Sequence, residues 1–247
     1  DKNFPPGKRQ YTLDFAYHGG IYRDVWMIGK SSVAITDALE ADKVAGGGVF
    51  VHFDNISGKK AEVYVDTEVH NSGKRTRTVA VETVLVDAGD VPVKRVSQQV
   101  KLQAGESKTV RQRFAVRNPK LWSPDSPYLY RIQSRVKAGH EVLDGGVTRV
   151  GIRKAEFKGK DGFWLNGKPF GQLVGANRHQ DFAYVGNALP NSQQWRDAKR
   201  LRDAGCTIIR VAHYPQDPAF MDACDEMGLF VIVATPGWQY WNKNPEF

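Results

Sequence analysis

The chain has 247 residues, of which 41% are hydrophobic and 25% charged, as in an ordinary folded protein. No apolar run approaches the roughly eighteen residues of a membrane-spanning helix, and the first residues lack the hydrophobic core of a signal peptide. The net charge of +8 raises nucleic-acid binding as a hypothesis, but no aromatic stacking motif or recognition helix accompanies the basic residues. We therefore expect neither a membrane nor a nucleic-acid partner.

Residues 1–30 contain two strand-like runs, joined at Gly19 and Gly20. A two-stranded hairpin cannot bury its own apolar face. We therefore interpret this segment as the C-terminal end of a larger domain.

Residues 31–152 show short alternating runs, separated by turns about every ten residues. The clearest runs are residues 49–53, 61–69, 78–86 and 109–116. This pattern predicts an immunoglobulin-like β-sandwich without an intersheet disulfide. The densest basic stretches, residues 74–77 and 108–113, fall in the same alternation, which is typical of a solvated sheet face. For Trp122 we expect core packing, with sugar stacking as the alternative.

Residues 163–170 predict a hairpin with a turn at Asn166 and Gly167, where Trp164 has a structural role. After the hairpin, apolar runs alternate with amphipathic segments. They predict strands at residues 170–174, 207–211 and 229–234, and helices at 192–204 and 218–227. Asn191 is the expected N-cap of the first helix, and Gly205 and Gly228 are the expected helix ends. This order gives two right-handed βαβ units.

Polar side chains follow the first two of these strands, in residues 175–181 and 210–215. Parallel α/β proteins place their chemistry at the carboxyl ends of strands. Zinc binding by His179, His213 and Asp181 is one hypothesis, but Arg178 and Arg210 would repel a cation. The same arginines suit carboxylates and a hydroxyl-rich substrate. No GxSxG motif marks a serine nucleophile, and the spacing of Cys206 and Cys224 favours free thiols.

Three motifs in this part carry a resemblance to a known family. They are Asn177-Arg178-His179, then Arg210 with His213-Tyr214-Pro215, then residues 222–229. In this order they resemble the opening of the catalytic barrel in glycoside hydrolase family 2, the β-galactosidase and β-glucuronidase family. Gly20 to Trp26 also resembles the last strands of the family's N-terminal jelly-roll domain.

The resemblance implies a multidomain β plus α/β fold. Residues 1–30 would be the remnant of a jelly-roll sugar-binding domain, residues 31–152 the immunoglobulin-like sandwich, and residues 153–247 the N-terminal part of a TIM (β/α)8 barrel. A complete barrel needs about 250 residues, whereas residues 156–247 number 92. Retaining glycosidases use two carboxylates about 5 Å apart, and this family takes them from strands four and seven. We therefore expect no catalytic carboxylate in this chain, and Glu226 in the second helix is no substitute.

The implied function is that of a retaining exo-glycosidase acting on terminal β-glycosides, with a β-galactosidase as the first hypothesis. A β-glucuronidase and a β-mannosidase are alternatives within the family, and a non-catalytic carbohydrate-binding or structural module is the alternative from another class. Gln180 stands where many relatives carry an acidic residue, which leaves the sugar open. We expect no cofactor and no metal. Besides an oligosaccharide, we expect a second copy of the chain as partner, because the apolar strands of a partial barrel need cover.

The resemblance also implies roles for single residues. Arg210 would orient the nucleophile, His213 would contact the sugar near the reacting carbon, and His179 would bind sugar hydroxyls. The same rim would include Asn177, Arg178 and Asp181, with Trp238 or Trp241 as a stacking face. Loop support remains the alternative, above all for Asn177 and Arg178.

Overall fold

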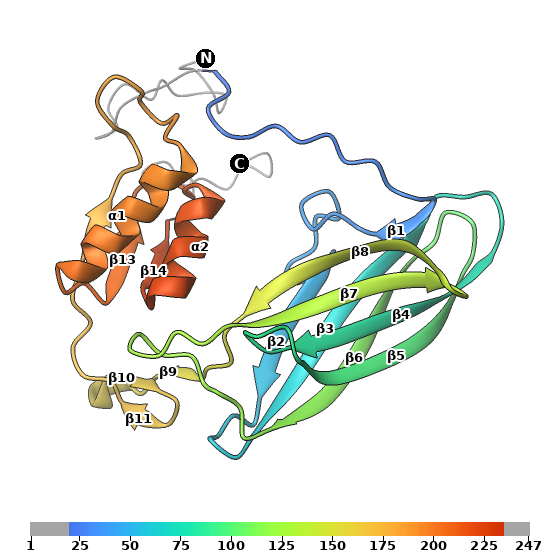
Figure 1. Ribbon diagram of the computed structural model, residues 1–247, viewed down its shortest axis with the longest axis horizontal. Helices are drawn as coiled ribbons and strands as arrows, with labels where there is room; N and C mark the ends of the chain where they lie inside the picture. The colour runs from blue at the N-terminus through green and yellow to red at the C-terminus, as the bar shows by residue number, and fades with distance from the viewer. Residues whose placement is uncertain (1–19, 235–247) are drawn as a thin grey trace. The chain divides into compact units, whose positions relative to one another are not determined.

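The computed structural model describes residues 20–234 (Figure 1). The chain divides into two compact units, one formed by residues 27–171 and the other by residues 172–234 together with 20–26. Among these residues, no helix has the length and apolar character needed to cross a membrane.

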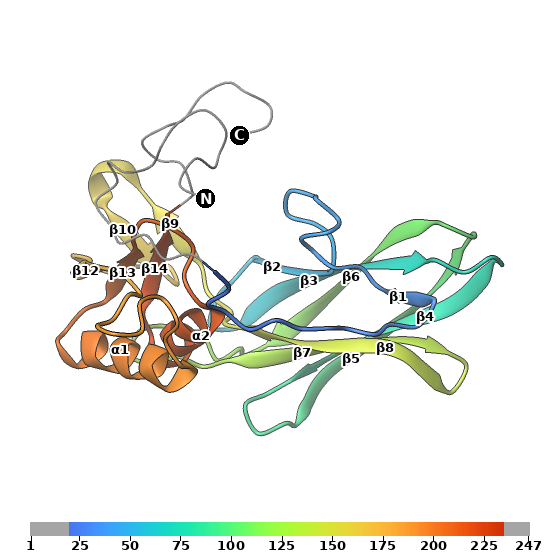
Figure 2. The same ribbon diagram turned by 90° about the horizontal axis from the view of Figure 1, so that it is seen from above.

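The first unit contains two antiparallel sheets that form the expected sandwich (Figure 2). In one sheet, β3 (Lys60–Asn71) pairs along one edge with β6 (Ser107–Arg117) and along the other with β1 (Val33–Ile35) and β2 (Val49–Asp54). The other sheet has the order β5-β4-β7-β8, from β5 (Pro92–Leu102), β4 (Arg77–Val86), β7 (Tyr130–Ala138) and β8 (Glu141–Val150). The immunoglobulin-like sandwich is confirmed.

Alternation along the strands builds the sandwich core. In β6, Val110, Phe114 and Val116 point inward and are buried, while every second residue is exposed. Trp122 is only 2% exposed, and a Cβ atom added to Gly151 would lie 2.8 Å from its ring. This close contact confirms the packing role expected for Trp122.

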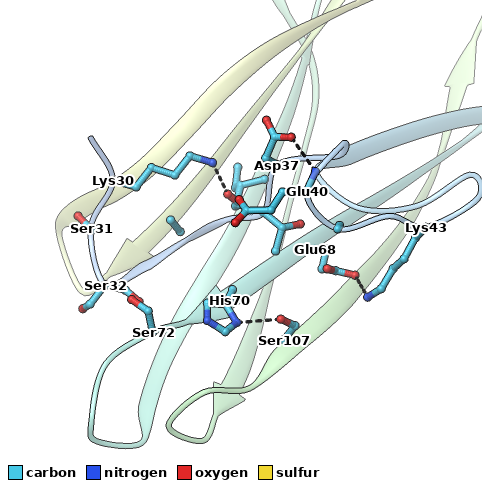
Figure 3. Close-up of a pocket in the computed structure, with 14 residues that line it drawn as sticks. Lys30, Ser31, Ser32, Asp37, Glu40, Lys43, Glu68, His70, Ser72 and Ser107 are labelled. Carbon is cyan, nitrogen blue, oxygen red and sulfur yellow. Dashed lines mark hydrogen bonds and ion pairs between the residues drawn. The ribbon is translucent and has the colours of Figure 1, made fainter. Parts of the chain in front are cut away.

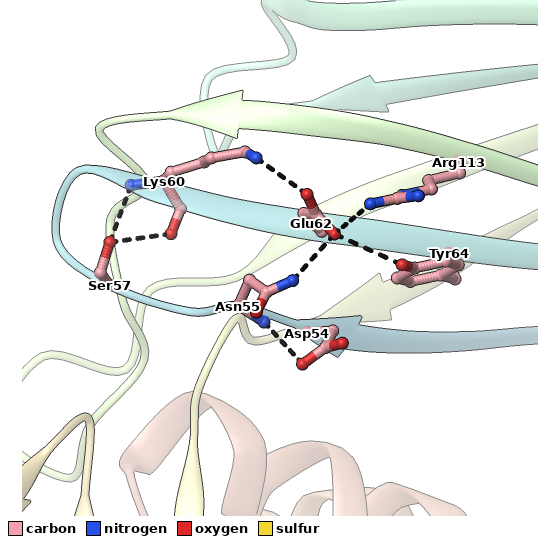
Figure 4. A network of polar contacts seen from close by, with 7 residues as sticks. All are labelled: Asp54, Asn55, Ser57, Lys60, Glu62, Tyr64 and Arg113. Atoms are coloured by element: carbon pink, nitrogen blue, oxygen red, sulfur yellow. Dashed lines mark hydrogen bonds and ion pairs between the residues drawn. The ribbon is translucent and has the colours of Figure 1, made fainter.

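The solvent face of the same sheet carries the basic residues in ion pairs (Figure 4). Glu62 accepts hydrogen bonds from Lys60 Nζ at 2.8 Å, Asn55 Nδ2 at 3.1 Å and Arg113 Nη2 at 2.6 Å. These donors, Lys60 first, lower the pKa of Glu62 to about 2. The positive charge of this face is thus largely matched by acids of β3, as expected for a solvated sheet surface.

The hairpin after the sandwich is confirmed and belongs to a small sheet of three strands. These are β9 (Ala155–Phe157), β10 (Phe163–Leu165) and β11 (Lys168–Pro169), with the short 3₁₀ helix η1 (Gly159–Asp161) between the first two. Asn166 and Gly167 take positive φ angles of 53° and 81°, as a type I′ turn requires. The Asn166 side chain also donates to the Trp122 carbonyl at 3.0 Å, which ties the turn to the sandwich.

The second unit is a parallel α/β layer, as expected. Its strands β12 (Gly175–Arg178), β13 (Ile208–Val211) and β14 (Phe230–Val233) form a sheet in that order. Two helices, α1 (Asn191–Asp203) and α2 (Pro218–Met227), cover one face of the sheet (Figure 2). Their core with the sheet includes Ala198, Ile209, Val211, Phe220 and Ala223, all fully buried. Asp217 caps α2 by accepting from the Ala219 amide at 2.8 Å, and Gly228 ends the helix with φ 73°.

Two expectations for this layer were wrong. The first strand is not residues 170–174, because the Phe170 amide donates to Phe163 and so continues the preceding hairpin. The ladder of β12 begins where the Val174 carbonyl accepts from the Thr207 amide at 2.7 Å. The N-cap of α1 is Pro190, with ψ 154°, and not Asn191. The carbonyl of Pro190 already accepts the Gln193 amide at 2.9 Å, so Asn191 lies inside the helix.

Of the two strand-like runs expected in residues 1–30, the part in residues 20–28 forms no strand, and Trp26 and Met27 are exposed there. The part in residues 1–19 lies outside the described residues.

Candidate functional site

The carboxyl ends of β12 and β13 bring two predicted site residues side by side. Asn177 pairs in register with Arg210, and Arg178 with Val211. Because successive side chains of a strand point to opposite faces, Asn177 and Arg210 share the face that the helices leave open. Their side chains meet there, with Arg210 Nη1 donating to Asn177 Oδ1 at 3.4 Å. A guanidinium and an amide therefore lie together on the open face.

This open face is hollowed. A depression of about 390 Å³ is lined by Leu173, Gly175, Ala176, Asn177, Ile208, Arg210 and Ile232. The close approach of β12 to β13 depends on Gly175, because a Cβ atom there would lie 1.6 Å from the Ile208 carbonyl oxygen. Only glycine at this position lets the two strands pair this closely beside the two polar side chains.

The two predicted histidines also come together. His179 directly follows β12, and His213 follows β13 by two residues. Their ring centroids are 5.4 Å apart at an interplanar angle of 78°, an edge-to-face contact. Both side chains are half-buried. Imidazoles from successive strand ends thus form one cluster of polar groups, a common source of donors to a bound polar molecule.

Arg178 has a different environment from Arg210. Its side chain is 5% exposed and lies on the helix-covered face. Nη2 and Nε donate to Asp197 Oδ2 at 2.6 and 3.2 Å, and the guanidinium carbon lies 4.0 Å from the centre of the Phe220 ring. The structure therefore separates Arg178 from the Asn177–Arg210 pair.

The next residues also divide between surface and interior. Asp181 is exposed, whereas Gln180 is fully buried and accepts the Asp217 amide at 3.0 Å through Oε1. The backbone amide of Gln180 donates to the Tyr214 hydroxyl at 3.4 Å, and burial raises the pKa of the Tyr214 phenol. Trp238 and Trp241 lie outside the described residues. Gln180 thus joins two loops rather than facing the open side.

The Arg178 side chain donates to three residues that the sequence analysis did not identify as site residues: Gln194, Asp197 and Gln216. Gln194 is fully buried and Gln216 is 5% exposed. One signal was present, because Gln194 lies four and seven residues before Ala198 and Leu201 on the apolar stripe of α1. A polar side chain on such a stripe indicates a buried hydrogen-bond partner.

The described residues offer little support for metal binding or for a cysteine nucleophile. Between residues 20 and 234, no group of three or more His, Cys, Asp or Glu side chains is arranged to hold a metal. Both cysteines are free. Burial raises the pKa of the Cys224 thiol to about 12, so it remains protonated and a poor nucleophile.

The sandwich contains a separate cavity of about 410 Å³ (Figure 3). Its polar groups are tied to one another: Glu68 forms an ion pair with Lys43, and His70 Nδ1 lies 2.8 Å from Ser107 Oγ. Asp37 accepts the amides of Leu39 and Glu40, which lower its pKa. Because these groups already serve the sandwich, the carboxyl ends of β12 and β13 are the better candidate site.

Comparisons with known proteins identify both units. The model described as "Glycosyl hydrolases family 2" matches residues 48–153, and the model for the TIM barrel domain of the same family matches residues 156–244. A β-galactosidase of Thermoanaerobacter pseudethanolicus is 34% identical over 97% of this chain, and a putative β-glucuronidase of Formosa agariphila is 33% identical over 94%. The chain spans 30% and 27% of the length of these two relatives.

Solved structures agree with this result. A β-glucuronidase of Bacteroides uniformis superposes with a TM-score of 0.82 at 29% identity, over 93% of this chain and 28% of its own. A putative β-galactosidase of Bacteroides fragilis gives a TM-score of 0.81 at 32% identity, over 88% of this chain and 32% of its own.

Proposed function

The chain belongs to family 2 of the glycosyl hydrolases, and we propose that it supplies the sugar-binding part of the active site of a retaining exo-glycosidase acting on terminal β-glycosides. Within it we assign residues 1–30 to a preceding jelly-roll domain, 31–152 to the sandwich and 153–247 to the first part of the barrel. The observation that carries the proposal is the cluster at the ends of β12 and β13. There, Arg210 contacts Asn177 on the open face and His179 contacts His213.

The chemistry of this cluster suits a sugar and a carboxylate. An arginine on the open face can hold a carboxylate through directional, charge-assisted hydrogen bonds, which keeps it ionised and oriented as a nucleophile. Imidazoles and an amide can donate to sugar hydroxyls and to the charge that develops in the transition state. We assign Arg210 to the nucleophile, His213 and His179 to the sugar, and Asn177 and Asp181 to the rim. Trp238 or Trp241 would supply the stacking face.

The two reacting carboxylates are proposed to come from outside residues 1–247. The three parallel strands β12, β13 and β14 are the first three of the barrel, whereas the family resemblance places the carboxylates on strands four and seven. Glu226 is an exposed residue of α2, the helix that covers the opposite face of the sheet. We therefore expect residues 1–247 alone to bind sugar weakly and to hydrolyse nothing.

A β-galactosidase is the first candidate activity, supported by β-galactosidases that are 34% and 32% identical to this chain. A β-glucuronidase is the second, supported by the relative at 33% identity and by the superposed β-glucuronidase structure. A glucuronide carries a carboxylate and a galactoside does not, so the two activities are separated by charge at the substrate's C6 position.

The test compares the gene product that contains residues 1–247 with those residues alone. Each is incubated with nitrophenyl β-galactoside, β-glucuronide and β-mannoside. We expect the gene product to release nitrophenol, fastest from the galactoside, and the isolated residues to match the buffer blank. Failure of the gene product on all three substrates would overturn the glycosidase proposal. Turnover by residues 1–247 that persists through repurification would overturn the proposed origin of the carboxylates.

A further inference from the structure

Arg178 is a buried cation with nearly all its donors in use. Its Nε and Nη2 donate to Asp197 of α1, Nη2 also donates to Gln194 Oε1 at 2.7 Å, and Nη1 donates to Gln216 Oε1 at 2.6 Å. The Phe220 ring of α2 lies against its face. A planar fork with five N–H groups can satisfy these acceptors together, which a lysine ammonium cannot.

The same residue holds the loop that follows β13 at both ends. At the start of the loop, the Ala212 amide donates to the Arg178 carbonyl at 3.0 Å. At its end, the Gln216 side chain donates to that carbonyl and accepts from the guanidinium. His213 lies between these two anchor points, and His179 is the residue next to Arg178. A second link joins the two loops, because Gln180 accepts the Asp217 amide.

We propose that Arg178 is a positioning residue that fixes the imidazoles of His179 and His213 relative to each other, an inference that rests on the proposed function of these two histidines. The buried guanidinium is rigid because α1, α2 and the loop after β13 all contact it. Anchoring of this kind keeps binding groups in their productive geometry before substrate arrives. Misplacement by about 1 Å can cost on the order of 100-fold in rate.

A purely structural role would predict a different result. If Arg178 only held α1 against the sheet, any loss of activity would follow the loss of folded protein, and the histidine contact would survive in the folded fraction. If Arg178 positions the histidines, their contact changes in protein that remains folded. Gln216→Ala separates the two cases, because it removes the Gln216 anchor of the His213 loop while Arg178 keeps its pair with Asp197.

The first measurement uses residues 1–247 and does not depend on activity. Nuclear Overhauser contacts between the two imidazoles are recorded for the wild type, Arg178→Lys, Gln216→Ala and the control Asp203→Asn. Asp203 lies on α1 in an exposed pair with Lys199. We expect the contact in the wild type and the control, and its loss in the other two variants. An unchanged contact in folded Gln216→Ala would overturn the proposal.

The second measurement is kinetic and uses the gene product that contains these residues. We expect Arg178→Lys and Gln216→Ala to lower kcat by about 100-fold and about 10-fold, with KM changed less than threefold, since a misplaced donor weakens transition-state binding most. Asp203→Asn should keep its kcat. Equal kcat in folded wild type and Gln216→Ala would overturn the proposal. A wild type with no turnover would instead refute the proposed function, and the imidazole contact would still decide the role of Arg178.

Discussion

Removal of the Asp197 carboxylate tests the energetics of the buried pair on which the site is built. Arg178 is 5% exposed and Asp197 24% exposed, and Asp197 is also held by Gln193 Nε2 at 2.8 Å. Breaking a buried ion pair from one side costs about 3–5 kcal/mol, because the other charge stays buried. Partial exposure of Asp197 lets water reach the vacated space. We therefore expect Asp197→Ala to destabilise the α/β unit by about 2–3 kcal/mol.

Asp203→Ala is the matched control, with the same substitution on the same helix. Its partner Lys199 and Asp203 are 65% and 60% exposed, so their pair contributes only about 0.3–0.5 kcal/mol. Alanine also raises helix propensity at both positions, so part of this gain is common to the two variants.

Native-state hydrogen exchange of the α1 amides measures the difference, because the two compact units need not unfold together. A difference of about 2 kcal/mol corresponds to roughly 30-fold faster exchange in Asp197→Ala than in Asp203→Ala. Exchange rates within about threefold of each other would refute the claim that the buried Arg178 depends on the Asp197 carboxylate.

Three further results are expected. The pKa of Glu62 is lowered from 4.5 to about 2. Its ion pairs therefore stabilise the sandwich above about pH 4.5, and this stabilisation is lost as the pH falls toward 2. The urea midpoints of unfolding at pH 6 and pH 3 should differ more in the wild type than in Glu62→Gln. Gly175→Ala should destabilise the α/β unit by about 1–3 kcal/mol, because the added Cβ would clash with Ile208. At the control position Gly146, an added Cβ would meet nothing within 4 Å, so Gly146→Ala should be tolerated better. Chemical unfolding measures the free energy of unfolding of both variants. Ile232 is 50% exposed on β14, so residues 1–247 should self-associate through this strand. Ile232→Lys should then lower the mass measured by light scattering. A monomer in both the wild type and the variant would refute self-association through β14.

Local signals in the sequence were sufficient for the elements whose conformation is decided locally. The Asn166–Gly167 turn needs two residues with positive φ, and Gly228 supplies the left-handed end of α2. Both features follow from backbone preference alone. The alternation of the sandwich strands likewise follows from which face meets the core.

The directions in which the site side chains point could be predicted only with knowledge of the strand register. A first strand at residues 170–174 would leave Asn177 and Arg178 in a loop, where both could face a substrate. The observed strand is Gly175–Arg178, and alternation within it sends Asn177 to the open face and Arg178 toward the helices. The burial of Gln180 depends on the Asp217 amide, which is distant in sequence. No local sequence pattern specifies the β12–β13 pairing or the Gln180–Asp217 hydrogen bond, so the orientations of these side chains were known only from the structure.

Steady-state kinetics of His213→Ala in the gene product that contains residues 1–247 show directly whether the ends of β12 and β13 bind the substrate. The proposed role of His213 is that of a donor to the sugar near the reacting carbon, held by contact with His179. It predicts that kcat/KM on the preferred nitrophenyl β-glycoside falls by about two to three orders of magnitude, with the variant still folded by circular dichroism. A folded His213→Ala variant with kcat/KM within about twofold of the wild type, well below the loss expected for such a donor, would show that His213 does not bind the substrate and would contradict the site proposed at the ends of β12 and β13.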